Sequence, residues 1–264
     1  LTIIACKKDG CTDPTAANYD SSADKDDGSC VAQTIVETSN SNNTGVNNGG
    51  ATTNSAVYGN GVTDVEGNTY QSVIIGNQEW MAENLKTVKY ANGDQIEEIQ
   101  YYYSWSYESN GNSRTSGAYC AYDNDQKCDS IYGKLYNWYS VADSRNLCPS
   151  GWHVSSDDDW SKLETYLDNN DYMYRGAIAL KADSGWIGEG SECKGNDNFG
   201  FRALPAGKRG YLGTFSYKGD NGYWWTASEQ SNPNGIYKYF LGGCGVIRAN
   251  TNKRSGFSVR CVKD

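Results

Sequence analysis

The sequence predicts an α+β protein with one large disulfide-linked domain, and three observations favour this class. Helical patterns lie in the middle of the 264-residue chain, and short strands separated by glycine-rich turns fill its second half. Helices that precede a strand-rich region are typical of α+β folds, since α/β folds alternate the two elements. The third observation is nine cysteines without C-x-x-C spacing and a single histidine, a pattern that favours disulfides over a zinc site.

The large domain is predicted to span residues 58–264 and to begin with a β-hairpin. Residues 69–75 alternate and then run apolar, as a partly buried strand does. Gly76 and Asn77 are a turn signal, and residues 78–81 read as the partner strand.

Three helices are predicted after this hairpin. The first covers residues 133–142 and has an apolar face made of Leu135, Trp138, Tyr139 and Ala142. Ser156 and Asp159 have the spacing of a capping box that begins the second helix, with an apolar stripe of Trp160, Leu163, Tyr166 and Leu167. The third is a short helix over residues 176–182.

Short strands are predicted in the last quarter of the chain, where glycine-rich turns separate apolar runs. They lie around Leu204 and at residues 223–227, 236–241, 246–249 and 257–262.

Charge and hydropathy exclude several kinds of partner. The net charge is −9 and no stripe of Lys and Arg is present, so a nucleic-acid partner is not expected. No apolar stretch approaches the length of a transmembrane helix. The first residues, LTIIAC, resemble the end of a bacterial lipoprotein signal, with Cys6 as the lipidated residue. Residues 1–9 are therefore predicted to be a signal remnant and anchor, which gives a membrane contact through lipid alone.

Residues 10–30 form a predicted small module, closed by a disulfide between Cys11 and Cys30. Its carboxylates would repel one another without a cation, and they are the oxygen ligands that Ca²⁺ takes: Asp13, Asp20, Asp24, Asp26 and Asp27. The alternative is that these aspartates are solvated loop residues. The segment resembles a short module common in secreted bacterial proteins. Residues 31–57, rich in Ser, Thr, Asn and Gly, read as a linker.

Several motifs of the large domain together resemble the Fibrobacter succinogenes major paralogous domain. They include IIGNQEWMAENLK, YGKLYNW, LCPSGWHV, ALPAG, YWWTASE and GFSVRCV, within residues 74–86, 132–138, 147–154, 203–207, 223–229 and 256–262. That family is similar to the C-type-lectin-like and formylglycine-generating-enzyme-like folds. The resemblance implies such a fold here, with short twisted strands, two to three helices and disulfides, in a secreted or surface protein.

The resemblance also implies a disulfide between Cys148 and Cys261. Cys120 and Cys128 are close in sequence, which favours a local bridge between them. Cys193 and Cys244 then remain as a third pair. Six cysteines allow fifteen connectivities, so other pairings stay open.

An aromatic cluster over residues 101–107, YYYSWSY, is the predicted binding surface. Exposed, Tyr103, Trp105 and Tyr107 would offer flat faces to a sugar ring or to a neighbouring subunit. The alternative is that the cluster is buried in a pair of strands, of which one face is exposed to solvent. In residues 232–234, Asn-Pro-Asn, a turn is predicted rather than the sugar-binding loop of calcium-dependent lectins, whose acidic partner motif is missing.

Catalytic chemistry is not expected. His153 is the single histidine and lies in Gly-Trp-His, where a structural polar role is predicted. Every cysteine has a disulfide or lipid partner in this scheme, which argues against the thiol chemistry of formylglycine-generating enzymes. The sequence therefore predicts a non-catalytic, extracellular or outer-membrane binding or adhesion protein with a glycan or protein ligand. The alternatives are a structural subunit that polymerises into a surface fibre or layer and, ranked lowest, a formylglycine-generating-like enzyme.

Overall fold

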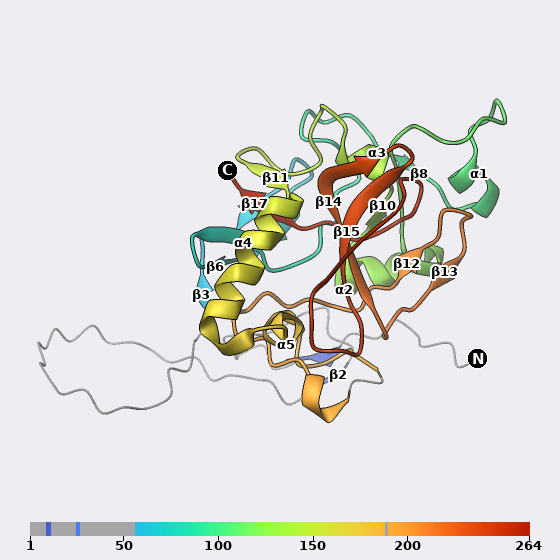
Figure 1. Ribbon diagram of the computed structural model, residues 1–264. Helices are drawn as coiled ribbons and strands as arrows, with labels where there is room; N and C mark the ends of the chain where they lie inside the picture. The colour runs from blue at the N-terminus through green and yellow to red at the C-terminus, as the bar shows by residue number, and fades with distance from the viewer. Residues whose placement is uncertain (1–8, 12–24, 27–55, 188–189) are drawn as a thin grey trace, which may run out of the picture. The chain divides into compact units, whose positions relative to one another are not determined.

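The computed structural model describes residues 9–11, 25–26, 56–187 and 190–264 (Figure 1). The chain divides into two compact units, residues 1–53 and 54–264. In the first unit, β1 (Asp9–Gly10) and β2 (Lys25–Asp26) pair in parallel, and Cys11 is buried.

The second unit mixes helices with many short strands, so the α+β prediction is confirmed. Its largest sheet is antiparallel and contains, in spatial order, β11 (Trp152–Val154), β17 (Cys261–Lys263), β7 (Gln78–Met81), β6 (Ser72–Ile75) and β3 (Val57–Tyr58). The predicted hairpin is β6–β7, with Ile75 opposite Gln78 across the turn. The last strand, β17, lies between β7 and the edge strand β11, so it is paired on both sides.

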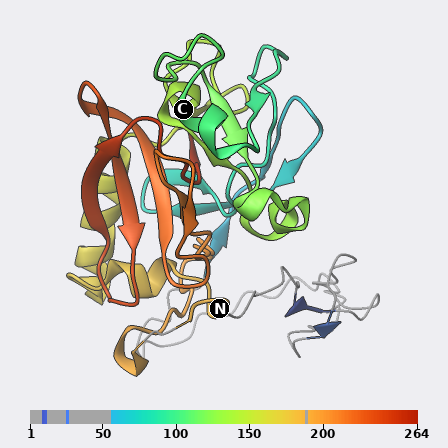
Figure 2. The ribbon, with the colours of Figure 1, turned by 90° about the vertical axis from the view of Figure 1, so that its right-hand side faces the viewer.

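A second antiparallel sheet faces the viewer in Figure 2 and contains β14 (Gly222–Ser231), β15 (Asn234–Phe240) and β16 (Ile247–Asn252). Residues 232–233 form the turn between β14 and β15, as predicted. Smaller pairings complete the strands: β4 (Val62–Thr63) with β5 (Thr69–Tyr70), β12 (Lys208–Arg209) with β13 (Phe215–Ser216), and β10 (Leu135–Tyr136) with β9 (Ala118–Cys120) and β8 (Glu97–Glu98). The strand expected around Leu204 is wrong, since Ala203 makes an isolated bridge to Lys181 there.

The longest helix of the described chain begins at the predicted capping box. In α4 (Asp157–Leu167), the Ser156 hydroxyl accepts the Asp159 backbone N–H, and the Asp159 carboxylate accepts the Ser156 N–H. This reciprocal pair satisfies two N–H groups that a helix start leaves without partners. The other helical segments are short: α1 (Tyr102–Ser106), α2 (Asp129–Tyr132), α3 (Trp138–Val141), α5 (Gly176–Leu180), 3₁₀ turns at Tyr122–Asn124, Gln126–Cys128 and Ser191–Cys193, and a π turn at Asp168–Tyr172.

The helix predicted over residues 133–142 is wrong in its first half. Residues Leu135–Tyr136 form β10, whose Tyr136 N–H donates to the Phe257 carbonyl. Asn137 then caps α3 by accepting the Ser140 N–H, so the helix begins only at Trp138. Pairing with distant strands overrides the local period, because a few apolar residues fit both helical and extended spacing.

Helix α4 packs between the two sheets through its apolar stripe. Trp160 lies at the centre, with its ring 5.1 Å from Trp80 of β7 and 6.3 Å from Trp224 of β14. All three rings are fully buried. Aromatic pairs at these separations add about 0.5–1.5 kcal/mol each beyond their area burial, so this cluster joins helix and sheets firmly.

The Arg260 guanidinium is fully buried beside this core. Its Nε donates to the Asn84 side chain at 2.7 Å, and Nη1 donates to the carbonyls of Met81 and Phe201 at 2.8 and 2.7 Å. Nη2 donates to the Arg202 carbonyl at 3.0 Å. Burial lowers the pKa of Arg260 to about 9. One side chain therefore joins three segments that are far apart in the sequence.

We expect Arg260→Ala to lower the free energy of unfolding by about 4 kcal/mol, because several buried acceptors lose their donor at once. Urea denaturation followed by tryptophan fluorescence measures this change. Lys162→Ala, at an exposed i,i+4 ion pair of α4, is the control and should leave the urea midpoint unchanged. A loss below about 1 kcal/mol for Arg260→Ala would contradict the role given to this side chain.

Candidate functional site

The candidate site is a groove of about 440 Å³ beside α1. Aromatic, acidic and basic side chains share its lining, which includes Glu97, Tyr103, Tyr107, Glu108, Arg114 and Ser116. Helix α1 lies at one end of the domain, close to the β12–β13 hairpin in Figure 1. Concave sites with a few convergent polar groups are where ligands usually bind.

A tight hairpin places the aromatic side of the groove. Helix α1 ends at Ser106, and Tyr107 then pairs with Ser113 across a turn. In this turn the Gly111 N–H donates to the Glu108 carbonyl. Gly111 has a backbone φ of 80°, which residues with a side chain rarely adopt. The turn therefore folds residues 107–113 back towards the helix and closes one wall of the groove.

Tyr103 and Tyr107 form the aromatic face of the site. Their ring centroids lie 4.9 Å apart with planes tilted by 32°. Tyr103 is 50 % exposed and Tyr107 is half-buried, so both rings keep surface open to solvent. The structure thus brings two of the three predicted binding residues together in the groove.

The prediction that Trp105 is a binding residue is wrong, because its side chain is buried and presents no face to a ligand. Its indole N–H donates to the Arg254 carbonyl at 2.6 Å, and the Arg209 guanidinium lies 4.4 Å from its ring. Extended backbone would put Tyr103, Trp105 and Tyr107 on one face. The helix instead puts residues four apart together and turns Trp105 towards the core.

Arg114 and two glutamates set the polar side of the groove. Arg114 is buried, and its Nη1 donates to Glu97 Oε2 at 2.8 Å and to the Ser116 hydroxyl at 2.7 Å. Glu108 Oε1 accepts the backbone N–H groups of Thr115 and Ser116, and the bond from Thr115 is the main cause that lowers its pKa. Each glutamate thus uses one carboxylate oxygen for these hydrogen bonds, which hold its side chain in the lining of the groove.

The site's chemistry suits recognition of hydroxyl-rich groups. Aromatic rings offer flat faces for stacking, and the carboxylates accept hydrogen bonds. Within the part of the chain that the structure describes, no group of three His, Cys, Asp or Glu residues is placed to hold a metal ion. Across the same residues, no helix has the length and apolar character that crossing a membrane needs.

The groove's charged residues, Glu97, Glu108 and Arg114, had not been predicted. Arg114 and Glu97 are separated by 17 residues and meet through the fold, so no local spacing marks them. A turn signal at residues 109–112, Ser-Asn-Gly-Asn, does mark the hairpin that carries Glu108.

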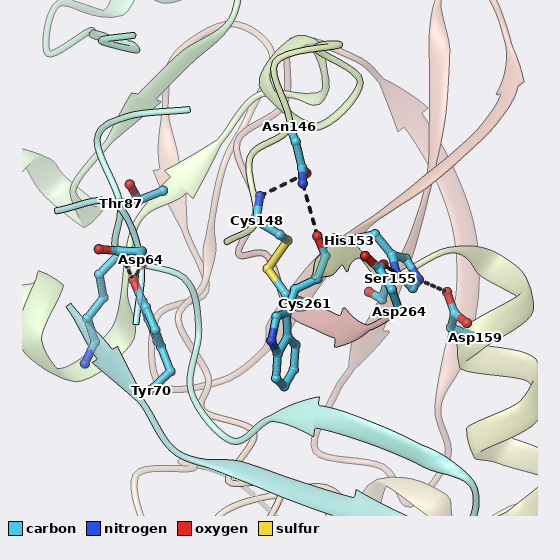
Figure 3. Close-up of a disulfide and its surroundings, with 12 residues drawn as sticks. Asp64, Tyr70, Thr87, Asn146, Cys148, His153, Ser155, Asp159, Cys261 and Asp264 are labelled. Carbon is cyan, nitrogen blue, oxygen red and sulfur yellow. Dashed lines mark hydrogen bonds and ion pairs between the residues drawn. A yellow bond between two sulfur atoms is a disulfide. The ribbon is translucent and has the colours of Figure 1, made fainter. Parts of the chain in front are cut away.

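Two disulfides lie within the second unit. Cys148–Cys261, with a Cα separation of 6.0 Å, joins the segment before β11 to β17 (Figure 3). Cys193–Cys244, with a Cα separation of 4.6 Å, is the other. The bridge expected between Cys120 and Cys128 is wrong, because Cys120 is a free, fully buried thiol in β9. Closeness in sequence did not predict the disulfide pairing, because the β9 backbone directs the Cys120 side chain into the core.

We expect the Cys120 thiol to react with iodoacetamide only after denaturation. Burial raises the pKa of Cys120 to about 12, so almost no thiolate exists at neutral pH. Peptide mapping by mass spectrometry, before and after urea, measures labelling at this residue. Rapid alkylation of Cys120 in the native protein would show that the thiol is accessible and reactive.

His153 bridges two carboxylates at the edge of the large sheet (Figure 3). Its Nδ1 lies 2.7 Å from Asp264 Oδ1, and its Nε2 lies 3.1 Å from Asp159 Oδ2. Burial lowers the pKa of His153, but the hydrogen bonds to the two aspartates outweigh it and raise the pKa above 6.5. His153 thus links β11 to the start of α4 and to Asp264 through two hydrogen bonds.

Stability should therefore fall as pH rises past 6.5. Because the folded-state pKa of His153 is raised, protonation stabilises the folded protein below pH 6.5, and this contribution is lost as pH rises through the folded-state pKa. Thermal melting across this range measures the effect. His153→Asn should flatten this step, and an unchanged pH profile in that variant would remove the assignment.

The remaining predicted residues lie outside the residues that the structure describes: Cys6, Asp13, Asp20, Asp24, Asp27 and Cys30. Asp26 belongs to β2 by its backbone. Calcium binding by the first unit therefore stays a prediction.

Comparison with known families identifies the large domain. The model of the Fibrobacter succinogenes major domain family matches residues 73–263, which is more than half of the chain. The chain belongs to this family, as its motifs predicted. No curated protein and no solved structure matches the chain significantly.

Proposed function

We propose that this protein is a non-catalytic binding or adhesion protein of the bacterial surface or extracellular space, and that the groove beside α1 binds a carbohydrate. The observation that carries the proposal is the pair of partly open rings of Tyr103 and Tyr107 over a groove with carboxylates. Sugars present apolar C–H faces and rims of hydroxyl groups, and the two halves of the groove complement these.

The composition of the groove favours a sugar over a peptide partner. Among the described residues that line it, none has an aliphatic side chain, and serines accompany the charged groups. Protein interfaces centre on desolvated anchors and are depleted of acidic residues and serine. A carbohydrate needs less apolar contact area than a peptide partner does, and more hydrogen-bond partners.

The fold and the cysteines support the cellular setting of this proposal. Two disulfides are typical of oxidising compartments such as the cell exterior. We also propose that the domain belongs among the C-type-lectin-like and formylglycine-generating-enzyme-like folds, which the α+β arrangement and the family membership support.

A glycan array followed by titration calorimetry on the neutral oligosaccharides that bind tests the proposal. Tyr103→Ala should weaken binding by about fivefold, because one aromatic stacking contact contributes about 1 kcal/mol. Tyr174→Ala removes a more exposed tyrosine between α4 and α5 and should change nothing. Absence of any glycan signal, or equal affinity of the Tyr103→Ala variant, would refute carbohydrate binding in this groove.

A further inference from the structure

The aromatic surface continues beyond the groove. The Arg254 guanidinium lies 5.9 Å from the Tyr107 ring and 5.6 Å from the Tyr211 ring. Tyr211 is 42 % exposed and belongs to the turn between β12 and β13. Tyr103, Tyr107, Arg254 and Tyr211 thus form a continuous row on the surface, which we call the aromatic strip.

The far end of the strip is held rigidly against α1. The Ser106 hydroxyl donates to the Tyr211 carbonyl at 2.9 Å. Gly213 packs directly on the helix, because a Cβ at this position would lie 2.5 Å from the Tyr102 carbonyl oxygen. The Gly210 N–H also donates to the Thr214 carbonyl at 2.7 Å, which closes the turn. Tyr211 is therefore positioned relative to Tyr103 before any ligand arrives.

Arg254 is likewise fixed between the rings. Its Nη1 donates to the Ser106 carbonyl at 3.1 Å and to the Ser113 hydroxyl at 3.4 Å, and its Nε donates to Asn252 Oδ1 at 3.2 Å. The guanidinium is half-buried, so its planar group fills the space between Tyr107 and Tyr211. A preorganised surface loses little side-chain entropy on binding, which favours affinity.

We propose that the strip is one extended site, in which the groove at Tyr103 and Tyr107 and the ring of Tyr211 are separate subsites for a neutral oligosaccharide. This inference rests on the proposed function and specifies its ligand class. Two aromatic subsites on either side of Arg254 require a chain of several sugars, since a single sugar occupies one of them. A neutral chain is favoured because the carboxylates of Glu97 and Glu108 balance the guanidinium charges of Arg114 and Arg254 along the strip.

The test compares short and long ligands on the full chain. Disaccharides and hexasaccharides of glucan, xylan, mannan and galactan are titrated against wild type, Tyr211→Ala and Tyr211→Phe. In at least one series, wild type should bind the hexasaccharide at least about fivefold more tightly than the disaccharide. Tyr211→Ala should remove this gain and leave the disaccharide affinity unchanged, whereas Tyr211→Phe should keep it because the ring remains.

Any other outcome contradicts the extended site, and the outcomes show whether carbohydrate binding at the groove fails with it. Equal wild-type affinity for both lengths, or a hexasaccharide gain that survives Tyr211→Ala, refutes the second subsite and leaves carbohydrate binding at the groove intact. Binding to none of the oligosaccharides refutes both the extended site and the proposed function. Tyr174→Ala is the matched control, and a loss of hexasaccharide affinity in that variant would show that the effect is not specific to the strip.

Discussion

The fold of the large domain depends on the hydrogen bonds that the buried guanidinium of Arg260 donates. A fully desolvated cation is costly, and here hydrogen bonds to backbone carbonyls and one amide oxygen, with the nearby charges of Glu83 and Asp197, offset that cost. Carbonyls come from rigid backbone, so the hydrogen bonds fix the relative positions of chain segments. Since Arg260 directly precedes Cys261, the disulfide to Cys148 secures the same segment of the chain covalently.

A second buried guanidinium connects this framework to the candidate site. Arg209 is fully buried and donates to the carbonyls of Ile99, Gln100 and Gly213, while its plane covers the ring of Trp105. Helix α1 has five residues and no side-chain cap, so it is too short to be stable alone. Anchoring by Arg209 and Trp105 explains how so short a helix can present tyrosines in a fixed geometry.

Local patterns predicted those parts of the fold that neighbouring residues stabilise. The capping box at Ser156 and Asp159 and the β6–β7 hairpin at Gly76 both depend on contacts within a few residues. The segment around Leu135 was mispredicted because its strand partners, Cys120 and the bridge at Phe257, are distant in the chain. The thiol of Cys120 was mispredicted for a related reason, since sequence separation carries no information on which way a strand residue points.

The sequence by itself determined the α+β class, the family, the cap of α4 and the aromatic character of residues 101–107. These follow from local hydrogen-bonding rules, periodicity and motifs that are contiguous in the chain. Only the tertiary structure decided that Trp105 faces the core while Tyr103 and Tyr107 face solvent, and that Arg114 and Glu97 complete the groove. The physical reason is that a short helix takes its orientation from the partners that bury one side of it, and Arg209 and Arg254 reach Trp105 from far along the chain.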